Sequence, residues 1–259
     1  MEVIITGECQ IGELVADDIA ALVARKPNAV LGLATGSSPM RIYDAVAQRV
    51  ARGELSLSRA RAFTLDEYVG LDRDHPCGYR TVIEEDFVSR VDLPTEAVRG
   101  PDGSATDLDA ACASYEEAIR LAGGVDLQIL GIGTDGHIAF NEPGSSFASR
   151  TRVKTLTVQT RRDNARFFNG DVNSVPTHCL TQGLGTIMEA RHIVLVATGA
   201  GKAEAVQHLV EGAVSALWPA TVLQHHPRVT VLLEDAAAAN LQRSDYYQYA
   251  YANRHLVNQ

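Results

Sequence analysis

Short runs of apolar, strand-forming residues alternate with longer stretches of helical periodicity along the whole chain, and this alternation restricts the fold more than any other feature. The strand-like runs lie at residues 3–6, 29–34, 62–65, 126–130, 192–197 and 229–233. Parallel strands must be joined by crossover helices. The pattern therefore predicts an α/β fold with a doubly wound, mostly parallel sheet and helices on both faces, as in Rossmann-like proteins.

The intervening stretches indicate helices, for example residues 11–22 and 108–119, and Pro39 is expected at the first position of another helix. The chain has 259 residues and no internal repeat, low-complexity tract or convincing linker. We therefore expect a single domain over residues 1–259.

Charge and patterning exclude several functional classes. The formal net charge of −9 argues against a partner that is a nucleic acid or an anionic membrane. The N-terminus lacks the features of a signal peptide, and no apolar run approaches membrane-spanning length, which predicts a cytoplasmic protein. The cysteines lack the paired spacing of a disulfide framework or a zinc ribbon and are read as free thiols: Cys9, Cys77, Cys112 and Cys179.

Ligands of doubly wound sheets bind beyond the carboxyl ends of the strands, so the loops that directly follow strands are the candidate site. One of them, just before Pro39, offers hydroxyls and backbone N–H groups at a helix N-terminus, where the helix dipole favours a phosphate. The same residues could also serve only as helix caps. They are Thr35, Gly36, Ser37 and Ser38.

Lys202 follows another strand, in a TGAGKA loop that does not match a Walker A motif. It is a candidate phosphate ligand or a surface lysine. A basic stretch from Arg150 to Arg166 suits a small anionic ligand, although a solvated helix face would have the same composition. Its cations are Arg150, Arg152, Lys154, Arg161, Arg162 and Arg166.

Two further loops carry groups that could move protons. Asp66 and Glu67 are adjacent at a strand end, so their side chains point in different directions and one of them could face the pocket as a base for an acidic C–H. In the loop at residues 131–144, Asp135 and Glu142 flank His137 and could fix its tautomer, which makes the imidazole a plausible proton shuttle. A structural loop histidine is the simpler alternative.

The loop at residues 131–144 formally contains GxGxxG, but it lies in the middle of the chain, and Pro143 and Gly144 interrupt the helix that a dinucleotide-binding motif requires. The motif is therefore not read as a nucleotide site.

Taken together, several motifs resemble those of the glucosamine-6-phosphate deaminase family over nearly the whole length. They are LGLATGSSPM, FTLDEYVGL, GIGTDGHIAFNEPGSSFASRTRVKTLT, ARFF and TGAGKA. The resemblance implies an enzyme that isomerises and deaminates glucosamine 6-phosphate to fructose 6-phosphate and ammonia, with no cofactor or metal. It also implies a homo-oligomer.

The resemblance assigns roles by motif. His137 would open the sugar ring with the help of Asp135 and Glu142, and Asp66 would move a proton between C2 and C1. The phosphate would lie on the loop at residues 35–38, with Arg166 and Lys202 as its cationic ligands.

Some members of this family are activated by N-acetylglucosamine 6-phosphate at a second site, and five residues here match positions used there: Ser145, Ser146, Arg152, Lys154 and Thr155. In a strand-like run, Arg152 and Lys154 would point to one face and could both reach a phosphate.

Two alternative functions remain open. The first is a 6-phosphogluconolactonase, which shares a GxGxDGH-like loop, although the IAFNEPG continuation with its third titrating group favours the deaminase. The second is a non-catalytic sugar-phosphate sensor. Such sensors carry a helix-turn-helix segment ahead of the sugar-binding fold, for which the strand at residues 3–6 leaves no room.

Overall fold

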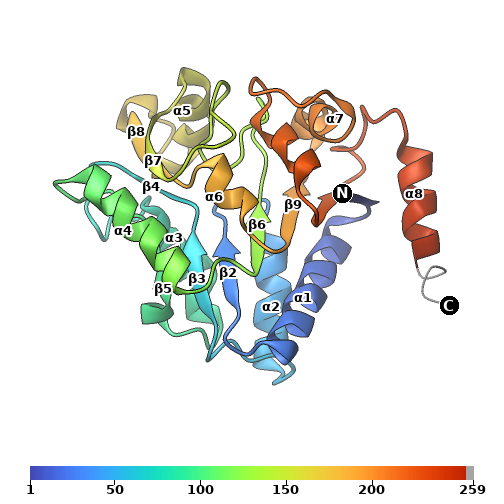
Figure 1. Cartoon of the computed structure of the whole chain (residues 1–259), viewed down its shortest axis with the longest axis horizontal. Coiled ribbons are helices and arrows are strands. Elements are labelled where there is room, and N and C mark those ends of the chain that lie inside the picture. The colour runs from blue at the N-terminus through green and yellow to red at the C-terminus, as the bar shows by residue number, and fades with distance from the viewer. Residues whose placement is uncertain (255–259) are drawn as a thin grey trace.

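The computed structural model describes residues 1–254, and a seven-stranded parallel sheet forms its centre (Figure 1). The strand order is β1-β10-β9-β6-β2-β3-β5, and every neighbouring pair is parallel. The strands are β1 (Glu2–Ile5), β2 (Val30–Leu33), β3 (Arg61–Thr64), β5 (Val98–Arg99), β6 (Leu127–Leu130), β9 (Ile193–Ala197) and β10 (Val229–Leu233).

The α-helices are α1 (Glu8–Arg25), α2 (Met40–Ala51), α3 (Tyr79–Asp86), α4 (Leu108–Leu121), α5 (Val158–Asn164), α6 (Leu184–Met188), α7 (Ala203–Glu211) and α8 (Ser244–Asn253). Helix α1 begins with Glu8 and ends with Arg25, which complements the helix dipole. The Asp107 side chain caps α4 by accepting a hydrogen bond from the Ala110 N–H at 2.9 Å.

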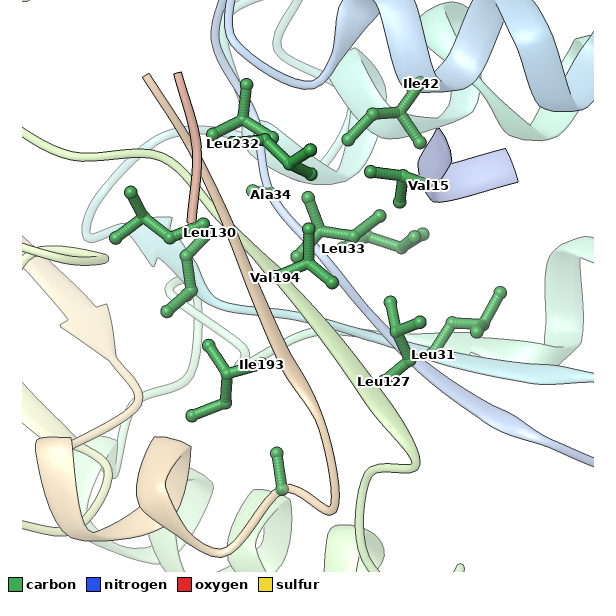
Figure 2. Packing of buried hydrophobic residues seen from close by; sticks show 14 of the residues in the cluster. Val15, Leu31, Leu33, Ala34, Ile42, Leu127, Leu130, Ile193, Val194 and Leu232 are labelled. Carbon is green, nitrogen blue, oxygen red and sulfur yellow. The ribbon is translucent and has the colours of Figure 1, made fainter. Parts of the chain in front are cut away.

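Both faces of the parallel sheet are buried. Figure 2 shows Val15 of α1 and Ile42 of α2 beside Leu33 on one face, while Leu130 and Ile193 point to the opposite face. Because the strands are covered on both sides, they are nearly continuous runs of apolar residues, which is why the sequence reveals them clearly.

A second, antiparallel sheet of three strands has the order β4-β8-β7, with β4 (Asp66–Tyr68), β8 (His178–Thr181) and β7 (Arg152–Thr155). In Figure 1, β7, β8 and α5 lie above the arrowheads of β2, β3 and β6, at the carboxyl ends of the parallel strands. A small cluster of buried residues, separate from the main core, includes Tyr68 of β4 and Cys179 of β8 together with Phe140 and Phe168.

The α/β fold and all six predicted strands of the parallel sheet are confirmed. Pro39 is the one local correction: it stands directly before α2 instead of inside its first turn, since the helix begins at Met40. The strand-like run predicted at Arg152 and Lys154 is β7, but the short edge strand β5, strands β4 and β8, and the pairing of β4, β8 and β7 into a separate sheet were not predicted. Within residues 1–254, none of the helices combines the length and apolar character that crossing a bilayer requires.

Candidate functional site

A cavity of about 710 Å³ opens where the parallel sheet meets the small antiparallel sheet. Most of the predicted site residues line it: the loop at residues 35–38, Asp66, His137, Arg166 and Lys202. A second cavity of about 160 Å³ is lined by Glu67 but by none of the residues predicted for catalysis, phosphate binding or effector binding. Residues that are far apart in the sequence are therefore gathered around one space, as expected for loops at the carboxyl edge of a parallel sheet.

The loop after β6 holds His137 by close backbone packing. A Cβ atom on Gly133 would lie 2.3 Å from the His137 ring, so only glycine leaves room for the imidazole. Gly136 has a φ of +80° and lies against Trp218, where a Cβ atom would be 2.7 Å from the indole. The Gly136 carbonyl also accepts a hydrogen bond from the Ala220 N–H at 2.8 Å, which fastens this turn to the following segment.

Two carboxylates flank the imidazole of His137. Its Nδ1 lies 2.7 Å from Asp135 Oδ1 and 3.7 Å from Glu142 Oε2. The contact between Nδ1 and Asp135 Oδ1 is short but poorly aligned for an N–H···O bond, because Nδ1 is buried without a hydrogen bond of regular geometry. Glu142 Oε2 is likewise buried without such a bond. Glu142 is anchored through Oε1, which accepts a hydrogen bond from the Thr157 N–H at 3.0 Å.

Burial alone would raise the pKa of Asp135, but the neighbouring His137 side chain and N–H outweigh it and lower the pKa to about 2. Asp135 is therefore a carboxylate throughout the neutral range, ready to stabilise a positive charge on the imidazole. By distance, the ligand atoms of Asp135, His137 and Glu142 all lie within 4.8 Å of one another, so the same group has the spacing of a possible cation site.

Asp66 and Glu67 diverge at the end of the strand. Asp66 is 6% exposed and lines the cavity, where burial and then the charge of Glu67 raise its pKa well above the usual value. The Glu67 carboxylate instead accepts hydrogen bonds from the Tyr79 and Arg80 N–H groups at 2.9 Å each and caps α3. Of the two acids, Asp66 is thus the one able to accept a proton from a bound ligand.

The residues predicted to bind a phosphate line the cavity together: the loop between β2 and α2, Arg166 and Lys202. The N-cap position of α2 is Pro39, which offers no side-chain cap, so Ser37 and Ser38 do not occupy the position from which a hydroxyl usually caps a helix. Burial lowers the pKa of Lys202, and the nearby Arg166 adds to this effect while Asp163 opposes it. A bound phosphate dianion would compensate both cations.

Only Arg166 of the basic stretch lines the cavity. Arg150 is paired with Glu116 and Glu189 at 2.5 Å each, and Arg161 donates to the carbonyls of Val172 and Val175. These two cations therefore have structural partners.

The five residues predicted for an effector lie outside the cavity: Ser145, Ser146, Arg152, Lys154 and Thr155. Arg152 donates to Ser145 Oγ at 3.2 Å, and Ser145 Oγ donates to the Glu142 carbonyl at 2.6 Å. Burial lowers the pKa of Arg152 and of Lys154, and the charge of Arg152 lowers that of Lys154 further. This group of residues therefore touches the backbone of Glu142.

The cavity also has walls that the sequence reasoning missed. Tyr79 of α3 and Asn164 of α5 line it, and both reach the Tyr68 hydroxyl, Tyr79 at 3.3 Å and Asn164 at 2.9 Å. The rule that ligands bind at loops after parallel strands does not predict Tyr79 or Asn164, because both residues belong to helices. The only available signal for Tyr79 was its proximity in sequence to the FTLDEYVGL motif.

Known proteins are similar to this chain over nearly its whole length. A glucosamine-6-phosphate deaminase of Beutenbergia cavernae is 68% identical over 253 residues, covering 97% of this chain and 97% of that protein. The glucosamine-6-phosphate deaminase of Mycolicibacterium smegmatis is 69% identical over 252 residues, with the same coverage of both chains, 97%.

Solved structures show the same fold. A monomeric glucosamine-6-phosphate deaminase superposes with a TM-score of 0.90 at 41% identity, covering 93% of this chain and all of that one. The 6-phosphogluconolactonase of Trypanosoma cruzi superposes with a TM-score of 0.75 at 19% identity, covering 93% of this chain and 97% of that one, which shows a shared fold alone. The family model for glucosamine-6-phosphate isomerases and 6-phosphogluconolactonases matches residues 9–232, and the chain belongs to this family.

Proposed function

We propose that this chain is an enzyme that converts glucosamine 6-phosphate and water to fructose 6-phosphate and ammonia. The observation that carries the proposal is the joint placement of Asp66 and His137 on one cavity that the loop at residues 35–38, Arg166 and Lys202 also line. The high identity to glucosamine-6-phosphate deaminases supports this reaction over lactone hydrolysis. The lactonases among the structural neighbours share too little sequence to argue for their activity.

Ring opening is assigned to His137. Opening the pyranose requires a proton to leave the C1 hydroxyl and a proton to reach the ring oxygen. Because Nδ1 faces Asp135 and Glu142, Nε2 is the ring nitrogen left for the substrate. The ionised Asp135 would stabilise the imidazolium formed while the proton is in transit.

Isomerisation is assigned to Asp66. In the open-chain aldose, the C2 proton is acidic because the C1 carbonyl accepts the electron pair. The Asp66 carboxylate would remove this proton to give an enolamine, and protonation at C1 would then give an imine at C2. Water adds to the imine, and ammonia leaves with breakage of the C–N bond. The raised pKa of Asp66 supports this role, since a base of higher pKa holds the transferred proton more readily.

Phosphate binding is assigned to Thr35, Gly36, Ser37, Ser38, Arg166 and Lys202. Two observations support the assignment: Ser37 and Ser38 line the cavity from positions outside the N-cap of α2, and Arg166 and Lys202 line the same cavity as cations. Binding energy from the remote phosphate would serve to position C1 and C2 of the sugar for reaction. We propose that neither a cofactor nor a metal takes part, because Asp66 and His137, with Asp135 and Glu142 beside the imidazole, suffice for the proton transfers.

The decisive test is ammonia release from glucosamine 6-phosphate, coupled to detection of fructose 6-phosphate. Equal amounts of the two products are expected. Hydrolysis of 6-phosphogluconolactone in place of ammonia release would assign the chain to the other activity of its family. Specific binding of the sugar phosphate with no turnover of either substrate would support a sensor.

We further propose that N-acetylglucosamine 6-phosphate binds at Ser145, Ser146, Arg152, Lys154 and Thr155 and activates the enzyme. The contact of Ser145 with the Glu142 carbonyl supports a link between this group and the catalytic loop. We also propose a cytoplasmic location. We propose in addition that the chain self-associates into a homo-oligomer, and light scattering is the direct test of its molar mass in solution. The neighbour of 41% identity is described as monomeric, so a monomer is the outcome that would contradict self-association.

A further inference from the structure

Asp66 and His137 belong to different elements, yet the reaction requires both to face the same substrate. Asp66 begins β4 of the small sheet, whereas His137 lies in the loop after β6 of the parallel sheet. An error of about 1 Å in the relative placement of two such groups can cost on the order of 10²-fold in rate. The contacts that join these two segments are therefore of functional interest.

Asn141 fixes the loop of His137 from the inside. It is fully buried, and its amide nitrogen donates to the Ile138 carbonyl at 3.0 Å and to the Gln182 carbonyl at 2.8 Å. Its Oδ1 accepts a hydrogen bond from Arg152 Nη1 at 3.0 Å, which orients the amide. One side chain thus joins the turn directly after His137 to Gln182, the residue that follows β8.

Gln182 continues the connection to the strand of Asp66. It is 1% exposed, its N–H donates to the Leu65 carbonyl at 2.8 Å, and its Nε2 donates to the Thr64 carbonyl at 3.3 Å. The same Nε2 donates to the Tyr115 hydroxyl at 3.0 Å. Both carbonyls immediately precede Asp66, so Gln182 holds the backbone from which this carboxylate projects.

Thr181 provides a second, parallel connection. It is fully buried in β8 and is the cross-strand partner of Asp66. Its hydroxyl accepts a hydrogen bond from the Phe140 N–H at 3.0 Å, in the loop of His137. Thr181, the last residue of β8, and Gln182, which follows it, therefore contact the catalytic loop on one side and the Asp66 segment on the other.

We propose that Asn141, Thr181 and Gln182 are positioning residues that hold the loop of His137 against the strand of Asp66. This inference rests on the proposed function. The three side chains are buried and hydrogen-bond to backbone groups and to the side chains of Arg152 and Tyr115, so they act through Asp66 and His137 and not on the substrate. Their hydrogen bonds fix a distance that the parallel sheet alone does not set, because β4 is not part of that sheet.

Gln182→Met is the primary test, because methionine keeps the length of the side chain and removes its hydrogen bonds. The matched control is Gln128→Met. Gln128 is also fully buried and donates from Nε2 to the Ile129 carbonyl at 2.9 Å, but it lies on β6 facing Gly32, away from the connection. Kinetics are measured for both at a temperature where circular dichroism shows each variant folded.

We expect Gln182→Met to lower kcat by about 10- to 100-fold while KM for glucosamine 6-phosphate stays within about threefold, because the phosphate-binding wall is untouched. Gln128→Met should keep the kcat of wild type, whatever its effect on thermal stability. If both variants lower kcat in proportion to their loss of stability, the role of Gln182 is structural and the inference is overturned.

If Gln182→Met fails to fold, Thr181→Val tests whether these residues position Asp66 and His137. It replaces the hydroxyl of a β-branched residue by a methyl group, and it removes both the acceptor of the Phe140 N–H and the 3.4 Å hydrogen bond that the hydroxyl donates to the Gln182 carbonyl. It should lower kcat with KM nearly unchanged, and wild-type kcat in this variant would overturn the inference. A wild-type chain that releases no ammonia would instead refute the proposed function, so the two failures are distinguishable.

Discussion

Asp66 is subject to two opposing demands, because the burial that makes it a stronger base also disfavours the charge it needs. We predict that Asp66→Asn retains binding of the phosphorylated sugar but loses roughly 10² to 10⁴ in turnover, the usual scale for a general base. Exchange of solvent deuterium into C1 or C2 is the direct readout. Undiminished exchange in the variant would remove Asp66 from the role of base.

The raised pKa of Asp66 also predicts a dependence of stability on pH. Between the usual pKa near 3.8 and its raised value, the folded protein keeps a proton that the unfolded chain has lost, so rising pH lowers the free energy of unfolding. At pH 7 wild type therefore carries a penalty that Asp66→Asn lacks. We expect a higher Tm for the variant at pH 7 and a smaller advantage below about pH 4. A lower Tm at pH 7 would contradict this account.

His137 is predicted to act before Asp66 in the sequence of steps. His137→Gln should impair turnover of the cyclic sugar more than that of an open-chain substrate analogue, because only the cyclic form needs proton transfer at C1 and the ring oxygen. His178→Gln, an exposed histidine on β8, is the control and should leave both substrates unaffected. Equal losses on both substrates in His137→Gln would exclude a ring-opening role.

At the scale of elements, how well the sequence predicts structure depends on burial. The strands of the parallel sheet are covered on both faces, so β9 at Ile193–Ala197 is entirely apolar and easily recognised. Strand β4 has three residues, Asp66–Tyr68, and β7 at Arg152–Thr155 is half-buried and polar. Their pairing is decided by contacts distant in sequence, which periodicity does not reveal.

The same contrast applies to the site. Residues in loops after parallel strands, such as Asp66 and His137, could be predicted, because topology alone brings those loops together. Tyr79 and Asn164 could not be predicted, since their helices α3 and α5 reach the cavity only through their packing around Tyr68. The hydrogen bond between Asn141 and Gln182 could not be predicted either, because 41 residues separate these two partners in the sequence.

Helix α3 depends on a carboxylate that also affects the chemistry. Glu67 accepts from the first N–H groups of this helix, and its charge raises the pKa of Asp66. We predict that Glu67→Gln destabilises the fold by about 0.5–2 kcal/mol, the usual cost of losing a cap. The acid limb of the pH–rate profile should shift to lower pH. Glu85→Gln is the control, because Glu85 is an exposed acid on the same helix, and it should change neither the stability nor the pH–rate profile. If the acid limb does not shift in Glu67→Gln, the charge of Glu67 does not affect the titration of Asp66.

At the scale of the whole molecule, regulation would require a second ligand to favour one of two global conformations, and the group at Ser145, Arg152 and Lys154 is the candidate site. It contains two partly desolvated cations with lowered pKa values, outside the cavity but joined to Glu142 through Ser145. Binding of an anionic effector there would compensate these charges and could change how the catalytic loop is held.

We therefore predict that N-acetylglucosamine 6-phosphate raises the initial rate at subsaturating glucosamine 6-phosphate, and that Arg152→Ala abolishes this activation. Arg162→Ala is the matched control, because Arg162 is an exposed cation of the same basic stretch outside the predicted group, and it should keep the activation. The measurement is initial rate against substrate concentration, with and without effector, for wild type and both variants. A hyperbolic curve that the effector leaves unchanged, together with unaltered kinetics in Arg152→Ala, would assign this stretch a structural role only.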